Sequence, residues 1–240
     1  MNIRIDFAYE PILFARTGAV VAYEQLARLP GGHDASWLML LGPSQRSTLD
    51  AEACLFAERV AHKKRIPVFL NCFPESTEAV AYAVHDNALL ALEVHEHTPH
   101  EVVERVAREY RRLWLVLDDV TDRADCARSQ PCERQDPLVR LIASEWLAHK
   151  PLWVKLPVHR AENTLYGDSA DLDLGKHLPR SWTVIQEGVQ PDELIACWYR
   201  GMLYAQGRRL PGGFRVRGNL VLDLPSCEEK AGESVRNAVA

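Results

Sequence analysis

Short apolar runs alternate with amphipathic stretches along most of the chain. The runs rich in β-branched and aromatic residues predict strands at 67–71, 88–94, 113–117, 152–156, 182–187 and 203–206. Amphipathic stretches predict helices between them, at 48–64, 75–87, 99–112, 136–149 and 190–200. Because strands separated by helices must pair in parallel, the pattern predicts an α/β fold, a TIM-like (β/α)8 barrel.

The start of the chain departs from this alternation. Residues 7–14 and 19–26 both have the pattern of strands, and the turn Arg16-Thr-Gly18 is too short to contain a helix. We therefore expect a hairpin, so that the first strand of the barrel is irregular and partly antiparallel. The length suits one barrel domain over residues 1–215, and the polar residues 216–240 predict a C-terminal tail that is partly disordered.

The composition limits the cellular compartment and the kinds of binding partner that we expect. The net charge of −5 argues against a DNA-binding protein, since such proteins are usually basic. No apolar run has the length of a membrane span and no signal peptide opens the chain, so we expect a cytoplasmic protein with no membrane partner. The six cysteines include no C-x-x-C pair, as is typical of a reducing compartment. Cys126 and Cys132 could be free thiols, a disulfide or metal ligands, and the sequence leaves their role open.

A polar residue closes most of the predicted strands. These residues are Glu24, Asn71, Glu93, Asp118 with Asp119, Lys155, Glu187 and Gln206. Each alone would be an ordinary solvated or turn residue, but the ends of parallel barrel strands converge on one face. Carboxylate and amide oxygens suit hard cations such as Mg²⁺ or Mn²⁺. The acids exceed what one ion needs, and a pair of metals is the arrangement that hydrolyses phosphodiesters.

Several motifs, taken together, resemble the EAL domain. They are Tyr9-Glu-Pro-Ile, Arg16-Thr-Gly18, Tyr23-Glu24-Gln-Leu26-x-Arg28, Leu92-Glu93-Val-His-Glu96, Leu117-Asp118-Asp119 and Ile185-Gln-Glu187-Gly-Val. The resemblance extends over about residues 7–211. It implies a barrel that uses two Mg²⁺ or Mn²⁺ ions to hydrolyse the bacterial messenger cyclic di-GMP to linear pGpG.

The resemblance also implies a role for each matching residue. The implied metal ligands are Glu24, Asn71, Glu93, Asp118, Asp119 and Glu187, with Asp118 bridging the two ions. Lys155 would lie beside the attacking water and act in catalysis with Glu187 and Glu24. Leu26, Arg28 and Gln206 would form the substrate site, in which a guanidinium suits a phosphate. Glu96 would steady the loop that follows the Asp-Asp strand.

That loop is where the chain departs most from the family. It has the sequence Asp118-Asp-Val-Thr-Asp-Arg123 and lacks both glycines of the family pattern, and the stretch from Asp119 to Lys155 is longer than usual. Three hypotheses therefore stay open. The protein is a phosphodiesterase, a degenerate EAL protein that regulates by binding cyclic di-GMP or a protein partner without turnover, or a metallohydrolase of another phosphodiester. In the family this loop also contributes to dimerisation, so a homodimer is a further prediction.

Overall fold

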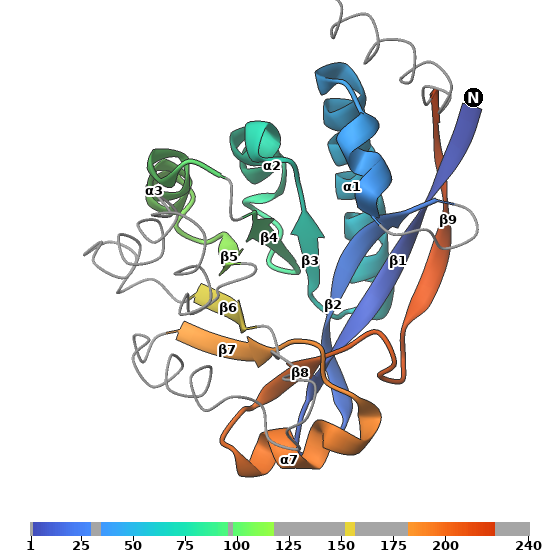
Figure 1. Ribbon diagram of the computed structural model, residues 1–240. Coiled ribbons are helices and arrows are strands. Elements are labelled where there is room, and N and C mark those ends of the chain that lie inside the picture. Colours follow the sequence, from blue (N-terminus) through green and yellow to red (C-terminus); the bar gives the residue numbers. More distant parts are fainter. Residues whose placement is uncertain (1, 30–34, 96–97, 118–151, 157–181, 224–240) are drawn as a thin grey trace, which may run out of the picture.

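Eight strands close into a barrel in the computed structural model of the chain, which describes residues 2–29, 35–95, 98–117, 152–156 and 182–223. The strands are β1 (Asn2–Phe14), β2 (Ala19–Arg28), β3 (Val68–Asn71), β4 (Leu90–Val94), β5 (Trp114–Leu117), β6 (Leu152–Leu156), β7 (Trp182–Gln186) and β8 (Tyr204–Gln206). From β2 to β8 each strand pairs in parallel with the next, and β1 closes the ring between β8 and β2 (Figure 1). The predicted TIM-like barrel is confirmed.

The first strand is antiparallel to both of its neighbours in the barrel, as the hairpin pattern predicts. It pairs with β2 from Asp6–Arg28 to Phe14–Ala19, with a register shift between Ile12 and Leu13, and its last residues pair with β8. A ninth strand, β9 (Phe214–Asp223), pairs antiparallel with the first half of β1 and lengthens the sheet beyond the barrel. The predicted domain boundary at residue 215 falls inside β9, and residues 224–240 lie outside the described part of the chain.

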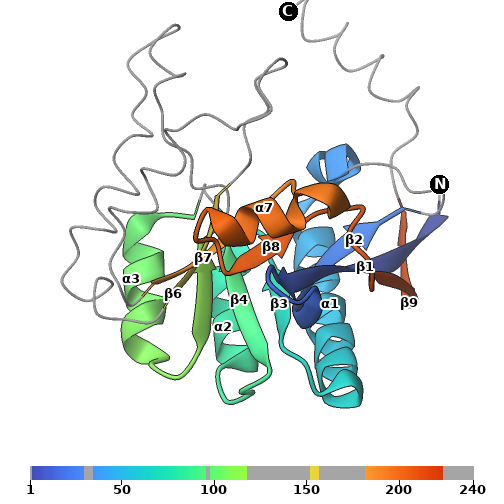
Figure 2. The same cartoon turned by 90° about the horizontal axis from the view of Figure 1, so that it is seen from below.

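The helices among the described residues cover the outside of the barrel. They are α1 (Pro43–Lys64), α2 (Thr77–Val84), α3 (His100–Glu109) and α7 (Leu194–Tyr199). Figures 1 and 2 show α1, α2 and α3 side by side along the outer face of β3, β4 and β5. The sequence predicts that α1 begins near Thr48, but it begins at Pro43, because a proline with no N–H to satisfy suits the first turn. Thr48 instead donates its hydroxyl to the carbonyl of Ser44 within that helix.

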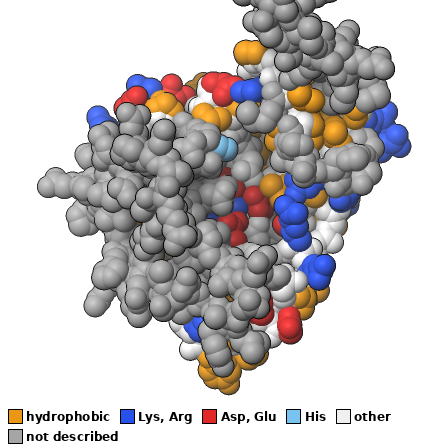
Figure 3. All heavy atoms as spheres, in the orientation of Figure 1, with side chains coloured by type: hydrophobic (Ala, Val, Ile, Leu, Met, Phe, Trp, Pro, Cys, Tyr) orange, Lys and Arg blue, Asp and Glu red, His pale blue; other side chains and the backbone are white. Residues whose placement is uncertain are grey.

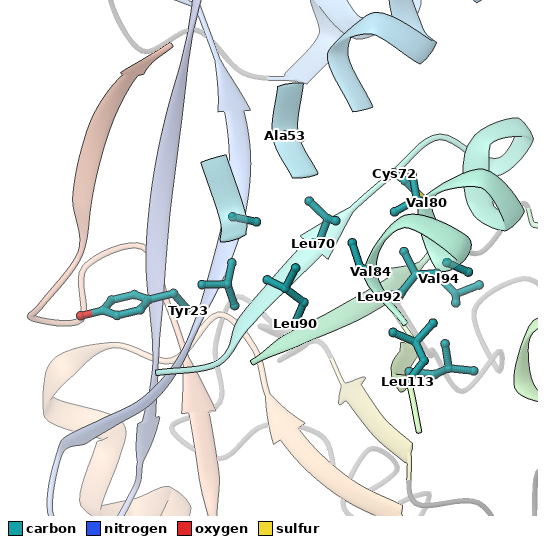
Figure 4. Packing of buried hydrophobic residues seen from close by; sticks show 14 of the residues in the cluster. Tyr23, Ala53, Leu70, Cys72, Val80, Val84, Leu90, Leu92, Val94 and Leu113 are labelled. Carbon is teal, nitrogen blue, oxygen red and sulfur yellow. The ribbon is translucent and has the colours of Figure 1, made fainter. Parts of the chain in front are cut away.

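Each buried strand has two apolar faces with different neighbours. The outward side chains pack against the helices, as Figure 4 shows for Leu70 of β3 and Leu92 of β4, which point toward Val80 and Val84 of α2. Burying both faces explains why these strands are nearly continuous apolar runs in the sequence. This outer layer contains most of the large apolar residues of the described core.

The inward side chains form a smaller apolar cluster in the barrel. Its buried members are Ile12, Ala22, Phe69, Ala91, Val116 and Ile185, with Trp153 and Tyr204 packed against them. On the parallel strands the next inward position toward the carboxyl end is polar, because strand side chains alternate between faces. These polar residues, each two positions after a residue of this layer, are Glu24, Asn71, Glu93, Lys155, Glu187 and Gln206. β1 runs in the opposite direction, so its corresponding residue is Glu10, two positions before Ile12. The apolar cluster is therefore the floor of a polar site at the carboxyl ends of the strands.

Among the described helices, none is long and apolar enough to cross a lipid bilayer.

Candidate active site

The centre of the polar layer is the ammonium group of Lys155, whose side chain is only 1% exposed. Its Nζ lies 2.7 Å from Glu93 Oε1, 3.0 Å from Glu24 Oε1 and 3.4 Å from Glu187 Oε1. The four side chains come from β2, β4, β6 and the residue that follows β7. Figure 3 shows acidic side chains gathered around a basic one in a hollow of this face of the molecule. The strand-end pattern in the sequence thus corresponds to one cluster in space.

Charge is unevenly balanced within this cluster. Removing an ion from water costs several kcal/mol, so buried carboxylates need close cations or hydrogen-bond donors. When all four side chains are ionised, three negative charges surround one positive charge. Ammonium–carboxylate distances of 2.7–3.4 Å show that the carboxylates converge closely enough to share a single cation.

Glu24 contacts three other side chains of the site, Lys155, Asn71 and Gln206. Asn71 donates from Nδ2 to Glu24 Oε1 at 2.9 Å and to the carbonyl of Gln25 at 3.3 Å, while Gln206 donates from Nε2 to Glu24 Oε2. Burial alone would raise the pKa of Glu24, but the Lys155 ammonium and the hydrogen bond from Asn71 outweigh it and lower the pKa. Glu24 is therefore a carboxylate at neutral pH and suits a role as a cation ligand.

The donor set fits a hard divalent cation. Glu24, Glu93 and Glu187 supply carboxylate oxygens, and Asn71 supplies an amide oxygen beside them. Gln206 Oε1 is buried and accepts no hydrogen bond from the described residues, so one further oxygen lies next to Glu24. In the described part of the chain no group of three or more His, Cys, Asp or Glu side chains is arranged so that it could hold a metal ion. Lys155 holds the central position among the acids.

Arg28, one of the expected substrate-binding residues, is in an ion pair. Its Nη2 lies 3.1 Å from Glu10 Oε1, and its Nη1 donates to the carbonyl of Ala27 at 3.1 Å. Leu26 and Arg28 follow Glu24 at alternate positions of β2, so the three side chains share one face of the strand. Both residues are partly exposed, as a residue that contacts a ligand must be.

Sequence reasoning missed Glu10 as a site residue. It lies directly opposite Glu24 in the β1–β2 register, and its side chain is only 18% exposed. Burial and the neighbouring Glu24 raise the pKa of Glu10, while Arg28 and Arg208 oppose the rise. The signal in the sequence was a single acid within the apolar stretch 7–14, but only the hairpin register places it beside Glu24.

Three predicted site residues lie outside the described part of the chain. They are Asp118, Asp119 and Glu96, and the loop with Cys126 and Cys132 lies outside it as well. β5 ends at Leu117 between β4 and β6, and Val116 belongs to the apolar floor. The bridging role expected of Asp118 stays a prediction, as do the roles expected of Asp119 and Glu96.

Solved structures with the same architecture are EAL-domain proteins. An EAL-domain protein from Listeria monocytogenes EGD-e aligns with 97% of this chain and 93% of its own, with a TM-score of 0.61 and 15% sequence identity. A standalone EAL protein from Vibrio cholerae O395, solved with c-di-GMP, aligns over 85% and 90% with a TM-score of 0.59 and 17% identity. BlrP1 from Klebsiella pneumoniae, solved with manganese and cyclic di-GMP, aligns with 89% of this chain and 59% of its own, with a TM-score of 0.61 and 19% identity.

The chain resembles these solved structures in fold and only weakly in sequence. No profile of a known protein family matches the chain, and no curated protein sequence matches it. At 15–19% identity the structural matches establish an EAL-type barrel, which confirms the fold expected from the motifs.

Proposed function

We propose that the protein is a metal-dependent phosphodiesterase that hydrolyses cyclic di-GMP to linear pGpG. The observation that carries this proposal is the convergence of Glu24, Glu93 and Glu187 on Lys155 at the carboxyl ends of the barrel strands. Solved structures with the same fold hold cyclic di-GMP, one together with manganese and others with calcium. We propose that the protein acts in the cytoplasm, where a bacterial messenger would reach it.

The proposed ligand set is Glu24, Asn71, Glu93 and Glu187, completed by Asp118 and Asp119. Two Mg²⁺ or Mn²⁺ ions would neutralise the clustered acids and the charge that develops on the phosphodiester. Lys155 has three ammonium protons and lies within reach of Glu93, Glu24 and Glu187. If metal ions took over these carboxylates, the ammonium could donate to a water or a phosphate oxygen beside them. Glu187 is the most exposed of the three acids, at 20%, and is the best placed to take a proton from water.

The remaining residues of the site would bind and orient the substrate. Arg28 and Leu26 lie on the face of β2 that carries Glu24, where a guanidinium and an apolar side chain can meet a phosphate and a base. Gln206 donates to Glu24 and so holds one oxygen of that carboxylate in a fixed direction. A fixed carboxylate costs less reorganisation when the transition state forms.

A second candidate is a regulator that binds cyclic di-GMP or a protein partner without turnover. It is favoured by the position of Lys155, whose ammonium already supplies the acids with a cation of the chain's own. The loop from Asp118 to Arg123, which lacks the glycines of the EAL pattern, favours it as well.

The two candidates are separated by incubating the protein with cyclic di-GMP and Mg²⁺ or Mn²⁺ and measuring pGpG by chromatography. We expect pGpG from the wild type and at least about a hundredfold less from Glu24→Ala, which lacks one proposed ligand. Glu101→Ala, on the exposed side of α3, is the matched control and should retain full activity. Binding without pGpG would select the regulator, and retained activity in Glu24→Ala would contradict the proposed site.

A further inference from the structure

Glu10 and Arg28 form an ion pair at the edge of the proposed substrate site. Their side chains are only 18% and 14% exposed, and Arg28 Nη2 lies 3.1 Å from Glu10 Oε1. The other terminal nitrogen of Arg28 donates to the carbonyl of Ala27. Both terminal nitrogens of the guanidinium are thus engaged by the protein itself, on the strand face that would receive an anionic ligand.

The position of Glu10 is unfavourable for a carboxylate. It faces Glu24 across the β1–β2 hairpin, and like charges at opposite positions of neighbouring strands repel. Arg208 lies near enough to interact with Glu10 electrostatically but forms no ion pair with it. Among the described residues, Arg28 is therefore the cation that pairs directly with Glu10, and Glu10 is its carboxylate partner.

We infer that Glu10 sets the affinity of this site for its anionic ligand by competing with the ligand for Arg28. The inference rests on the proposed function, in which Arg28 contacts the phosphate of cyclic di-GMP. A phosphate that approaches Arg28 must share or break the 3.1 Å ion pair, and it also meets the negative charge of Glu10. Glu10 thus lowers the affinity of the site for the ligand.

The inference predicts a gain of affinity from a single substitution. Glu10→Gln keeps the size of the side chain and removes its charge, so Arg28 is free to bind phosphate and the repulsion is lost. We expect the Kd for cyclic di-GMP to fall about fivefold to tenfold. The measurement is calorimetric titration with Ca²⁺ in place of Mg²⁺, so that turnover does not consume the ligand.

Two comparisons make the test specific. Glu78→Gln breaks a different glutamate–arginine pair, with Arg105, between α2 and α3 on the outside of the barrel, and should leave the Kd unchanged. In a variant that already carries Arg28→Ala, the added Glu10→Gln change should lower the Kd by less than it does in the wild type, because the contested cation is gone and only the repulsion by Glu10 remains to be removed. Thermal melting of each variant shows whether it is folded.

The outcomes distinguish this inference from the proposed function. Tighter binding by Glu10→Gln supports the inference if the gain is smaller in the Arg28→Ala background. Binding by Glu10→Gln when the wild type does not bind supports it as well. A gain that is equally large without Arg28 would contradict competition for Arg28. If the wild type binds or hydrolyses cyclic di-GMP and Glu10→Gln binds it equally or more weakly, the inference is wrong while the proposed function stands. If neither protein binds cyclic di-GMP, both are overturned.

Discussion

The ammonium of Lys155 on β6 lies 2.7 Å from Oε1 of Glu93 on β4, and both side chains are almost fully buried. The two strands are separated by β5 and by 62 positions of sequence. A charge pair at this depth is costly to form and more costly to break, because the remaining partner keeps an uncompensated charge in a poorly solvated place. The stability of the barrel should therefore depend on the Lys155 ammonium that compensates the buried acids of the site.

Replacing Lys155 tests that link. Lys155→Met keeps the length of the side chain but leaves Glu24, Glu93 and Glu187 without their common cation. Measured by urea unfolding in EDTA, the free energy of unfolding should fall by about 3–5 kcal/mol. Added Mn²⁺ should raise the melting temperature of the variant more than that of the wild type, since the metal would compensate the same acids.

The control for this substitution is Lys63→Met on the exposed end of α1, which should change the unfolding free energy by less than about 0.5 kcal/mol. A Lys155→Met variant as stable as the wild type in EDTA would show that the ammonium does not hold the acids together. The variant should also lose at least about a hundredfold in pGpG formation.

The buried carboxyl group of Asp50, on α1, should make the free energy of unfolding depend on pH. It is 5% exposed, and its carboxylate accepts a hydrogen bond from the backbone N–H of Phe73 at 3.3 Å. Burial raises its pKa from 3.8 to about 7, against the opposing hydrogen bonds from Ser76 and Phe73. Between about pH 4 and pH 7 the unfolded chain ionises at Asp50 while the folded protein keeps the proton, so the free energy of unfolding falls as pH rises.

Asp50→Asn removes that titration. At pH 8 the variant should be more stable than the wild type by about 1–3 kcal/mol, and the difference should shrink as the pH falls below about 4, where Asp50 becomes protonated in both states. Urea unfolding across this pH range is the measurement. Asp86→Asn, at a side chain that is 85% exposed, should show no comparable trend. A constant difference between Asp50→Asn and the wild type at all pH values would contradict the raised pKa.

Gly207 makes a close backbone contact that holds the end of β8. A Cβ at this position would lie 2.0 Å from the carbonyl oxygen of Val189, whose own N–H donates to the carbonyl of Gln206 at 3.0 Å. Gly207→Ala must therefore push these two segments apart and move Gln206 away from Glu24. We expect a loss of about 2–3 kcal/mol in unfolding free energy and a weaker Mn²⁺ affinity, measured by urea unfolding and by calorimetry.

Gly42→Ala is the comparison for Gly207, because the nearest atom to its added Cβ would be a flexible side-chain atom of Gln45 at 3.8 Å. That variant should lose no more than about 1 kcal/mol. An equal loss in both variants would indicate that the Val189 contact has no special role.

Much of the architecture follows from local patterns. The strands from β3 to β8 are short apolar runs, and an apolar run is sufficient to predict a strand that is buried on both faces. The hairpin of β1 and β2 is predicted because the turn between them is too short for a helix. The predicted ends of the helices are less accurate. Thr48 and Pro43 are both acceptable first residues for α1, and the extended backbone of Gly42 is what starts the helix at Pro43.

The candidate site is predictable in part for the same reason. Parallel strands in a barrel place their carboxyl ends on one face, so Glu24, Asn71, Glu93 and Lys155 can be grouped from strand-end positions alone. The structure brings these side chains within hydrogen-bonding or ion-pair distance of one another. Their proposed roles in metal binding and catalysis stay predictions, as do the bridging role of Asp118 and a homodimer.

The sequence by itself determined the alternation of strands and helices and the chemical type of each strand end, because both depend on short-range periodicity. Only the tertiary structure decided that Lys155 lies among three carboxylates, that Glu10 opposes Glu24 and pairs with Arg28, and that β9 extends the sheet along β1. These relationships depend on strand register and barrel closure. Closure joins residues far apart in the chain, and a shift of one residue would turn each side chain to the opposite face.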